Sequence, residues 1–258
     1  MFLSPFPEKN YCRQNGALVS LQAKIASNAY IGEGTIIYPN VNIADGCHIG
    51  SHCIIGEPSA SYYERPSDYE FKETFIGNGS IIRSHSIIYA GVEIGDNFQS
   101  GHRITIRELS KIGKDCSVGT LSDLQGKLVI GNHVRLHSNV HIGQMSIIDD
   151  YVWIYPYVVL TNDPYPPMGE LKGVTVKQFA QVCTSAVILP GLTIGENALI
   201  GAGAVVTKDV LSERVVLGNP GKDICSVRDL RNEKGKQIYP WKDFLSVYRG
   251  YPWQKEEN

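Results

Sequence analysis

The sequence predicts an all-β solenoid built from very short strands. Isoleucine recurs every six residues from Ile25 to Ile55, a spacing that neither an α-helix nor a single strand requires. The same six-residue spacing resumes from Ile76 to Leu160 and again from Val176 to Val206. We call each residue at this spacing a beat; there are 27 beats, of which 26 are Ile, Leu or Val. Glycine often follows the beat directly, as at Gly32, and supplies a tight corner. Such a pattern is typical of a hexapeptide β-helix.

Each six-residue unit is interpreted as a short strand followed by a corner. Three units close one triangular coil of 18 residues, with the beat residue pointing inward. Coils stack by backbone hydrogen bonds at roughly 4.8 Å. The 27 beats therefore predict about nine coils over residues 25–210, after an N-terminal lead-in at 1–24.

Two segments interrupt the beat. Residues 57–75 and 161–175 are rich in Pro, Tyr and charge, and predict loops that leave the solenoid. Such loops often carry function because a rigid scaffold positions them, although a tolerated insertion has the same composition. Residues 211–258 form a C-terminal extension, in which KDICSVRDLR predicts a short helix.

The composition narrows the classes of partner and compartment. The formal net charge of −2 does not favour binding to nucleic acid or to a membrane surface. The N-terminus lacks a basic region followed by an apolar run, and no apolar stretch is long enough to span a bilayer, so we expect a cytoplasmic protein. The six cysteines lack a CxxC pair, which favours reduced thiols over a disulfide or metal framework.

Residues 18 apart should lie in one column on one face. Glu108, Gly126, Gln144 and Asn162 are successive members of such a column, each two residues after its beat. Gly126 is expected to leave a hollow between its neighbours. The column is either an ordinary polar surface or the lining of a substrate site.

A second column begins at Ser100, the one beat that is not aliphatic. His102 and Arg103 follow it, and His137 follows a beat two coils later on the same face. Ser100 either marks a functional break in the pattern or is a buried polar side chain with internal hydrogen bonds. His137 is either a catalytic contact or a structural histidine.

The beat, the second loop and the stretch from Leu189 to Lys222, LPGLTIGENALIGAGAVVTKDVLSERVVLGNPGK, resemble the left-handed β-helix acyltransferases. The resemblance covers residues 25–222. It implies a left-handed helix, an acyl-coenzyme A donor and a homotrimer with active sites between subunits. The left hand comes from this resemblance, because the general rule for crossovers would predict a right hand.

A narrower resemblance rests on residues 95–108 and 131–166 and on the YPW motifs of the tail. These segments are similar to N-acetyltransferases that act on nucleotide-linked amino sugars, above all thymidine-diphosphate-linked 3-amino-3,6-dideoxyhexoses. The resemblance implies acetyl transfer from acetyl-CoA to the amino group of such a sugar, in the synthesis of bacterial surface glycans such as lipopolysaccharide and S-layer glycan. We expect no resident metal.

On this interpretation His137, Gln144 and Asn162 are the catalytic candidates. Gln144 is an amide where relatives can carry a carboxylate, so we expect positioning of the amine rather than an obligate protein base. Arginines would meet the pyrophosphate, and Tyr89 would stack on the base. The expected substrate-binding residues are Tyr89, His102, Arg103, Arg107, Glu108, Asn139 and Asp163.

Coenzyme A is expected along the later coils, where small residues recur in two columns. A thin pantetheine arm could lie in the resulting groove, with lysines near the phosphates of the coenzyme. The expected cofactor-binding residues are Ser185, Ala186, Gly203, Ala204, Lys208, Gly221 and Lys222.

Three alternatives remain open at this stage. A β-helix zinc hydratase related to carbonic anhydrase would use His102, His137 and His141, but two coils after His102 the register reaches Ser138. An O-acetyltransferase acting on a simple sugar or serine would often carry a loop histidine, which 161–175 lacks. A non-enzymatic assembly scaffold would bind no acyl-CoA.

Overall fold

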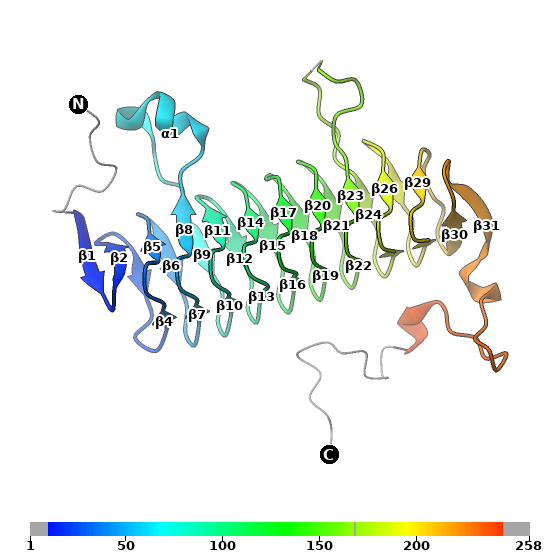
Figure 1. The fold of residues 1–258 in the computed structure, drawn as a ribbon, viewed down its shortest axis with the longest axis horizontal. Coiled ribbons are helices and arrows are strands. Elements are labelled where there is room, and N and C mark those ends of the chain that lie inside the picture. The colour runs from blue at the N-terminus through cyan, green and yellow to red at the C-terminus, as the bar shows by residue number, and fades with distance from the viewer. Residues whose placement is uncertain (1–9, 168, 245–258) are drawn as a thin grey trace. The chain divides into compact units, whose positions relative to one another are not determined.

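The computed structural model describes residues 10–167 and 169–244. The described residues divide into two compact units, unit 1 up to Leu128 and unit 2 from Val129 onward. Each unit is a left-handed parallel β-helix with three faces (Figure 1). The beat prediction is therefore confirmed in its main point. Among the described residues, no helix is long and apolar enough to cross a membrane.

Unit 1 stacks its strands coil on coil in parallel, apart from β1 (Tyr11–Gln14), which pairs antiparallel with β2. Its first face consists of β2 (Ala17–Ser20), β5 (Ile36–Ile37), β8 (Ile54–Glu57), β11 (Ile87–Tyr89), β14 (Thr105–Ile106) and β17 (Asp123–Leu124). The second consists of β3 (Lys24–Ile25), β6 (Val41–Ile43), β9 (Thr74–Ile76), β12 (Glu93–Ile94) and β15 (Lys111–Ile112). The third consists of β4 (Tyr30–Ile31), β7 (His48–Ile49), β10 (Ile81–Ile82), β13 (Gln99–Ser100) and β16 (Ser117–Val118).

Unit 2 repeats this arrangement, and β31 (Lys222–Ser226) closes it as an antiparallel partner of β30. Its first face consists of β20 (His141–Ile142), β23 (Val159–Leu160), β26 (Val187–Ile188) and β29 (Val205–Val206). The second consists of β18 (Val129–Ile130), β21 (Ile147–Ile148), β24 (Thr175–Val176) and β27 (Thr193–Ile194). The third consists of β19 (Arg135–Leu136), β22 (Trp153–Ile154), β25 (Gln181–Val182), β28 (Leu199–Ile200) and β30 (Arg214–Leu217).

The core of each unit is the row of beat residues. Ile37, Ile55 and Ile88 in unit 1 and Ile154 and Ile200 in unit 2 are fully buried. The residue four positions after the beat is often small and buried as well, which explains the cysteines found there: Cys47, Cys53 and Cys116. Ile25, the first predicted beat, is half-buried. The interior is therefore a continuous stack of aliphatic side chains that removes apolar surface from water.

The corners are built by residues with positive φ. Asn and Gly occupy many of these positions, but Leu121, Tyr151 and Phe179 also take values near +60°. A left-handed conformation costs such side chains on the order of 1 kcal/mol. Stacking offsets part of this cost in unit 2, where the Tyr151 and Phe179 rings lie parallel with centroids 5.0 Å apart.

The two predicted loops leave the helix without disturbing its register. Ile43 pairs with Ile76 across the first loop, and Ile148 pairs with Val176 across the second. The first loop contains α1 (Ala60–Glu64) and the 3₁₀ helix η2 (Pro66–Asp68) (Figure 1).

The ends of the solenoid differ from the prediction. Strand β2 lies in the predicted lead-in and already pairs with β5, and β30 lies in the predicted extension and pairs with β28. The three faces therefore hold slightly more strands than nine coils provide. The segment KDICSVRDLR forms β31 followed by the 3₁₀ helix η3 (Val227–Asp229), because Val216 and Val215 offer β31 an edge to pair with.

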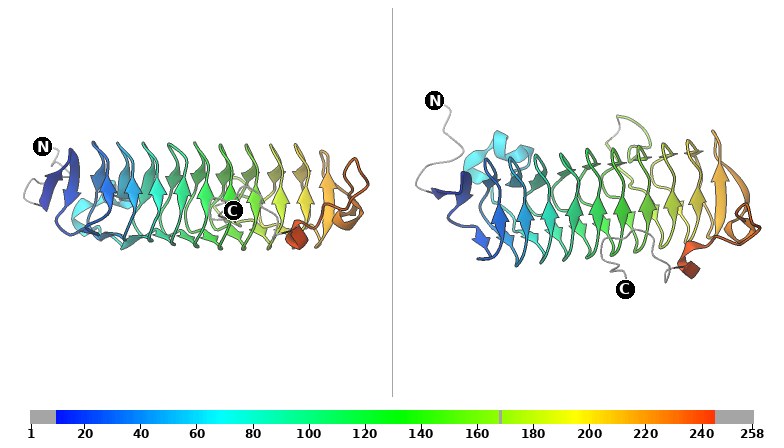
Figure 2. Two further views of the ribbon diagram at one scale, coloured as in Figure 1. Left: turned by 90° about the horizontal axis from the view of Figure 1, so that it is seen from below. Right: turned by 60° about the horizontal axis from the view of Figure 1, so that its bottom comes forward.

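The C-terminal segment returns along unit 2 and ends, within the described residues, at η4 (Trp241–Phe244) (Figure 2). The Trp241 side chain is 2% exposed, and its indole N–H donates to the Phe179 carbonyl at 2.8 Å. Its ring also contacts the rings of Tyr151 and Trp153. The first YPW motif thus anchors the segment, whereas the second lies outside the described residues.

We expect Trp241→Ala to destabilise the protein by about 3–5 kcal/mol, because the substitution empties a buried aromatic site. Urea unfolding monitored by circular dichroism measures the change. Lys242→Ala is the matched control, because it removes only a surface ion pair with Glu196 and should cost about 0–1 kcal/mol. Equal losses for the two variants would show that Trp241 is no anchor.

Candidate functional site

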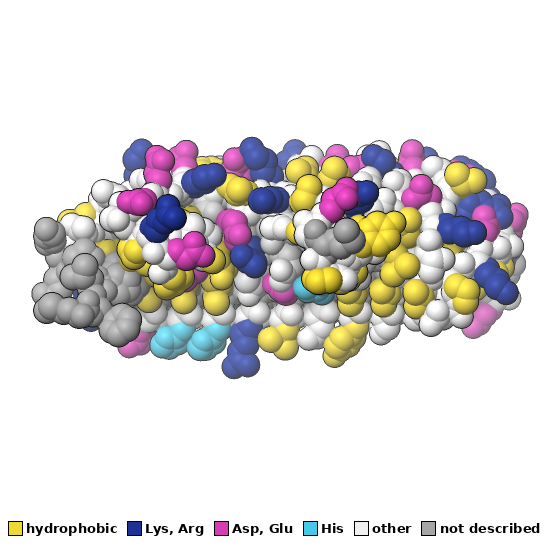
Figure 3. Space-filling view, turned by 90° about the horizontal axis from the view of Figure 1, so that it is seen from above, with side chains coloured by type: hydrophobic (Ala, Val, Ile, Leu, Met, Phe, Trp, Pro, Cys, Tyr) yellow, Lys and Arg dark blue, Asp and Glu magenta, His cyan; other side chains and the backbone are white. Residues whose placement is uncertain are grey.

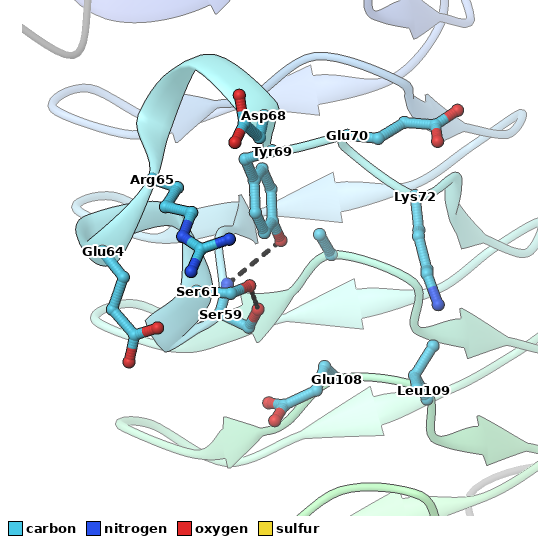
Figure 4. A pocket seen from close by; sticks show the side chains of 11 residues that line it. Ser59, Ser61, Glu64, Arg65, Asp68, Tyr69, Glu70, Lys72, Glu108 and Leu109 are labelled. Atoms are coloured by element: carbon cyan, nitrogen blue, oxygen red, sulfur yellow. Dashed lines mark hydrogen bonds between the residues drawn. The ribbon is translucent and has the colours of Figure 1, made fainter.

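A cleft of about 630 Å³ lies in unit 1 between the first loop and the adjoining coils (Figure 4). Ser59, Ser61 and Arg65 line it from the loop, and Ala90 and Glu108 line it from the coils. Figure 3 shows charged side chains of both signs gathered over this loop. The volume lies within the range of small-molecule sites, about 300–1,000 Å³.

Three predicted substrate-binding residues come together beside this cleft. Arg107 donates from Nε and Nη2 to the two carboxylate oxygens of Glu108, at 3.1 and 3.0 Å. The guanidinium carbon of Arg107 also lies 5.5 Å from the centroid of the Tyr89 ring. Burial raises the pKa of the Tyr89 hydroxyl, which keeps that group neutral. The side chain of Glu108 is only 19% exposed, so its carboxylate is held in one orientation.

The base of the first loop carries a second polar group. The hydroxyl of Tyr63 donates to Glu57 at 2.8 Å, and burial raises the pKa of the Glu57 carboxyl. Beyond it, Tyr69 packs edge-on against Tyr62 and Phe71, with ring centroids 5.5 and 5.0 Å away. The bond to Glu57 joins the loop to the end of β8, and the ring contacts pack the loop on itself.

Of the two interpretations of Ser100, the structure supports a buried polar side chain with internal hydrogen bonds. Its hydroxyl accepts from the Arg83 amide and donates to the Gly101 carbonyl, both at 2.8 Å, and the residue is 1% exposed. His102 and Arg103 follow at the surface of unit 1. The Nδ1 of His102 lies 2.8 Å from the Ser84 hydroxyl, and Arg103 occupies a corner with φ of 56°.

Gly126 does not leave the hollow expected of it. A Cβ atom there would lie 3.0 Å from the Glu108 carbonyl oxygen, and φ is +98°. Glycine is needed because the neighbouring coil approaches closely and the backbone is left-handed.

His137 lies in an aromatic setting in unit 2. Its imidazole stacks on the Tyr155 ring at a centroid distance of 5.0 Å and an angle of 8°, and meets Trp153 edge-on. Burial, and to a lesser extent the charge of Arg135, lowers the pKa of His137 below its ordinary value. The imidazole is therefore neutral at pH 7 and able to accept a proton.

The register predicted for Gln144 and Asn162 is correct. His141 pairs with Val159 and Ile142 with Leu160, which places Asn162 in the same column as Gln144. Asn162 is the second residue of the second loop, and its carbonyl accepts from the Lys172 amide at 2.7 Å. Asp163 accepts from the Tyr165 amide at 3.2 Å and so shapes the turn that follows. Asn139 occupies a corner of the same unit with φ of 58°.

The residues expected to bind coenzyme A fall into three groups. Ser185, Gly203 and Lys208 are exposed, and a Cβ at Gly203 would meet no atom within 4 Å. Ala186 and Ala204 are fully buried, so their side chains face the core rather than a groove.

Gly221 and Lys222 do not continue the columns of Gly203 and Ala204. Leu199 pairs with Val215, a step of 16 residues rather than 18, and Lys222 opens the antiparallel strand β31. The spacing rule therefore fails at the last coil.

Several residues beside these sites were not predicted to bind a ligand. Ser59, Ser61 and Arg65 line the cleft because of the internal fold of the first loop, which no periodicity indicates. Tyr155 could have been found, because it follows His137 by 18 residues. Within the described ranges, no three His, Cys, Asp or Glu side chains are grouped so as to hold a metal ion.

Comparison with known proteins identifies the repeat. Residues 24–59 match the family described as bacterial transferase hexapeptide (six repeats). Over these residues the chain is similar to the hexapeptide repeat of bacterial transferases. The bifunctional protein GlmU of Geobacillus thermodenitrificans is 30% identical over 80% of this chain and 42% of its own length. The galactoside O-acetyltransferase of Escherichia coli is 34% identical over 42% of this chain and 61% of its own length.

Among solved structures, an Arabidopsis UDP-N-acetylglucosamine acyltransferase has the same fold, with a TM-score of 0.67 and 18% identity over 82% of this chain and 73% of that one. The chain spans less than half the length of the GlmU proteins that it matches. These similarities support the hexapeptide repeat and the fold, and they do not identify the substrate.

We expect the imidazole of His137 to titrate below pH 6.5 in the folded protein, where burial disfavours its charged form. The unfolded chain takes up this proton near pH 6.5, so the folded state loses stability as the pH falls below about 6.5. Nuclear magnetic resonance titration of the ring nitrogens measures the midpoint.

Tyr155→Ala should move this midpoint upward, because it exposes the imidazole to water. Arg135→Gln should produce a smaller upward change, because charge is the lesser cause. A midpoint unaffected by Tyr155→Ala would contradict burial as the main cause.

Proposed function

We propose that this protein transfers an acetyl group from acetyl-CoA to the amino group of a nucleotide-diphosphate-linked amino sugar. The observation that carries the proposal is the hexapeptide β-helix, whose two loops leave the register of the coils unchanged. It combines a repeat found in bacterial transferases with a polar second loop. Acetyl transfer is supported by relatives named as acetyltransferases. The amine acceptor and the nucleotide-linked sugar rest on the sequence resemblance over residues 95–166.

The proposed reaction requires little of the protein. The neutral amine nitrogen attacks the thioester carbon, the carbon–sulfur bond breaks, and the proton of the amine passes to His137 or to the leaving thiolate. Holding the two reactants together supplies most of the rate enhancement. A backbone N–H would stabilise the oxyanion.

Asn162 and His137 are proposed to orient the amine, with Gln144 assisting through a hydrogen bond. The neutral imidazole of His137 suits this role, because it can accept a hydrogen bond from the amine. The amide of Gln144 carries no charge and serves as a donor or an acceptor, but not as a base. The exposed Ser185, Gly203, Lys208 and Lys222 are proposed to contact coenzyme A.

We further propose a cytoplasmic homotrimer that serves bacterial surface-glycan synthesis. O-acetylation of a simple sugar remains a second candidate, because the galactoside O-acetyltransferase is among the relatives. A thiol-release assay separates the two candidate functions, because amino and hydroxyl acceptors can be compared in it directly.

Thiol release from acetyl-CoA with a panel of nucleotide-linked amino sugars tests the function. Asn162→Ala should lower kcat/KM about 100-fold, because it loosens the position of the amine. His137→Asn should cost less than this if His137 only positions the amine, whereas a general base would contribute about 10²–10⁴-fold.

Lys177→Ala is the control, because it removes only the ion pair with Asp149 on the surface of unit 2. It should leave turnover unchanged. Thiol release with a simple sugar but with no amino sugar of the panel would overturn the N-acetyltransferase proposal.

A further inference from the structure

The cleft beneath the first loop offers mainly hydrogen-bond acceptors. The carboxylates that line it are Glu64, Asp68, Glu70 and Glu108, against two cations, Arg65 and Lys72. An ionised carboxylate accepts hydrogen bonds and donates none. A ligand that binds these carboxylates must therefore present hydroxyl or N–H groups, and the excess of negative charge disfavours a group with two negative charges.

Glu108 is the best-placed acceptor on the coil side. Each carboxylate oxygen accepts one hydrogen bond from Arg107 and retains capacity for another. Arg107 also packs over the Tyr89 ring, so the guanidinium that binds the Glu108 carboxylate is itself held in place. Figure 4 shows Glu108 on the coil side of the cleft, with Ser59, Ser61 and Arg65 on the loop side.

Tyr69 provides a rigid aromatic wall. Its hydroxyl accepts from the Ser59 amide at 3.1 Å, and Tyr62 and Phe71 hold its ring edge-on. Aromatic contact on one side and a fixed carboxylate on the other suit a planar base joined to a hydroxylated ring. A carboxylate that hydrogen-bonds a ribose hydroxyl is a recurring device in nucleotide sites.

We propose that this cleft binds the nucleoside part of the acceptor, and that its phosphates lie outside. Glu108 accepts a hydrogen bond from the pentose hydroxyl, and Tyr69 contacts the base. This inference rests on the proposed function in that it takes the acceptor to be nucleotide-linked. It adds the subsite, and it makes unphosphorylated uridine or thymidine a sufficient ligand.

Isothermal titration of the full chain with uridine, thymidine and their diphosphates tests the subsite. Glu108→Gln should weaken binding of the preferred nucleoside about tenfold, because it removes a charge-assisted hydrogen bond. Ser61→Trp, on the exposed side of α1, should abolish binding by filling the cleft without altering the coils. Circular dichroism establishes that each variant is folded.

Glu93→Gln is the matched control, because it removes a carboxylate of unit 1 that pairs with Lys111 on the second face. Its nucleoside affinity should equal that of the wild type. Unchanged affinity in both Glu108→Gln and Ser61→Trp overturns the inference, as does binding of a free amino sugar in place of any nucleoside. Loss of nucleoside binding in these variants supports the subsite even if no acetyl transfer is found, so the two proposals fail separately.

Discussion

The parallel hydrogen bonding of one coil to the next is the constraint on which everything else depends. It pairs beat with beat, so that Ile43 lies against Ile76 although the first loop separates them in sequence. A shift of one residue would turn the aliphatic row outward along a whole face. The register therefore survives both insertions, and the loops project from fixed positions.

The same close stacking also constrains the residue that directly follows each beat. Glycine follows many beats because the next coil approaches closely; a Cβ at Gly101 would lie 2.3 Å from the Thr120 amide nitrogen. His137 and Tyr155 occupy the corresponding place in unit 2, and their rings stack on each other. Both rings are half-buried there, and the Nε2 atom of His137 is buried.

Counting by six and by 18 predicted the core, the loops and the column of Gln144 and Asn162, because these follow from backbone geometry alone. The count failed at Gly221, where the final coil is shorter and ends in a hairpin. It could not predict the cleft, because the fold of the first loop depends on contacts among Tyr62, Tyr69 and Phe71. Contacts of this kind do not recur at a fixed spacing in the sequence.

Charge pairing changes the role expected of the arginines. Arg107 was expected to meet a pyrophosphate, but its guanidinium already binds both oxygens of Glu108. A phosphate would have to compete with that carboxylate, and the acidic lining of the cleft opposes it as well. Arg103 lies exposed at a corner of unit 1. The ion pair of Arg107 is therefore better understood as the support of a hydroxyl-binding carboxylate than as part of an anion site.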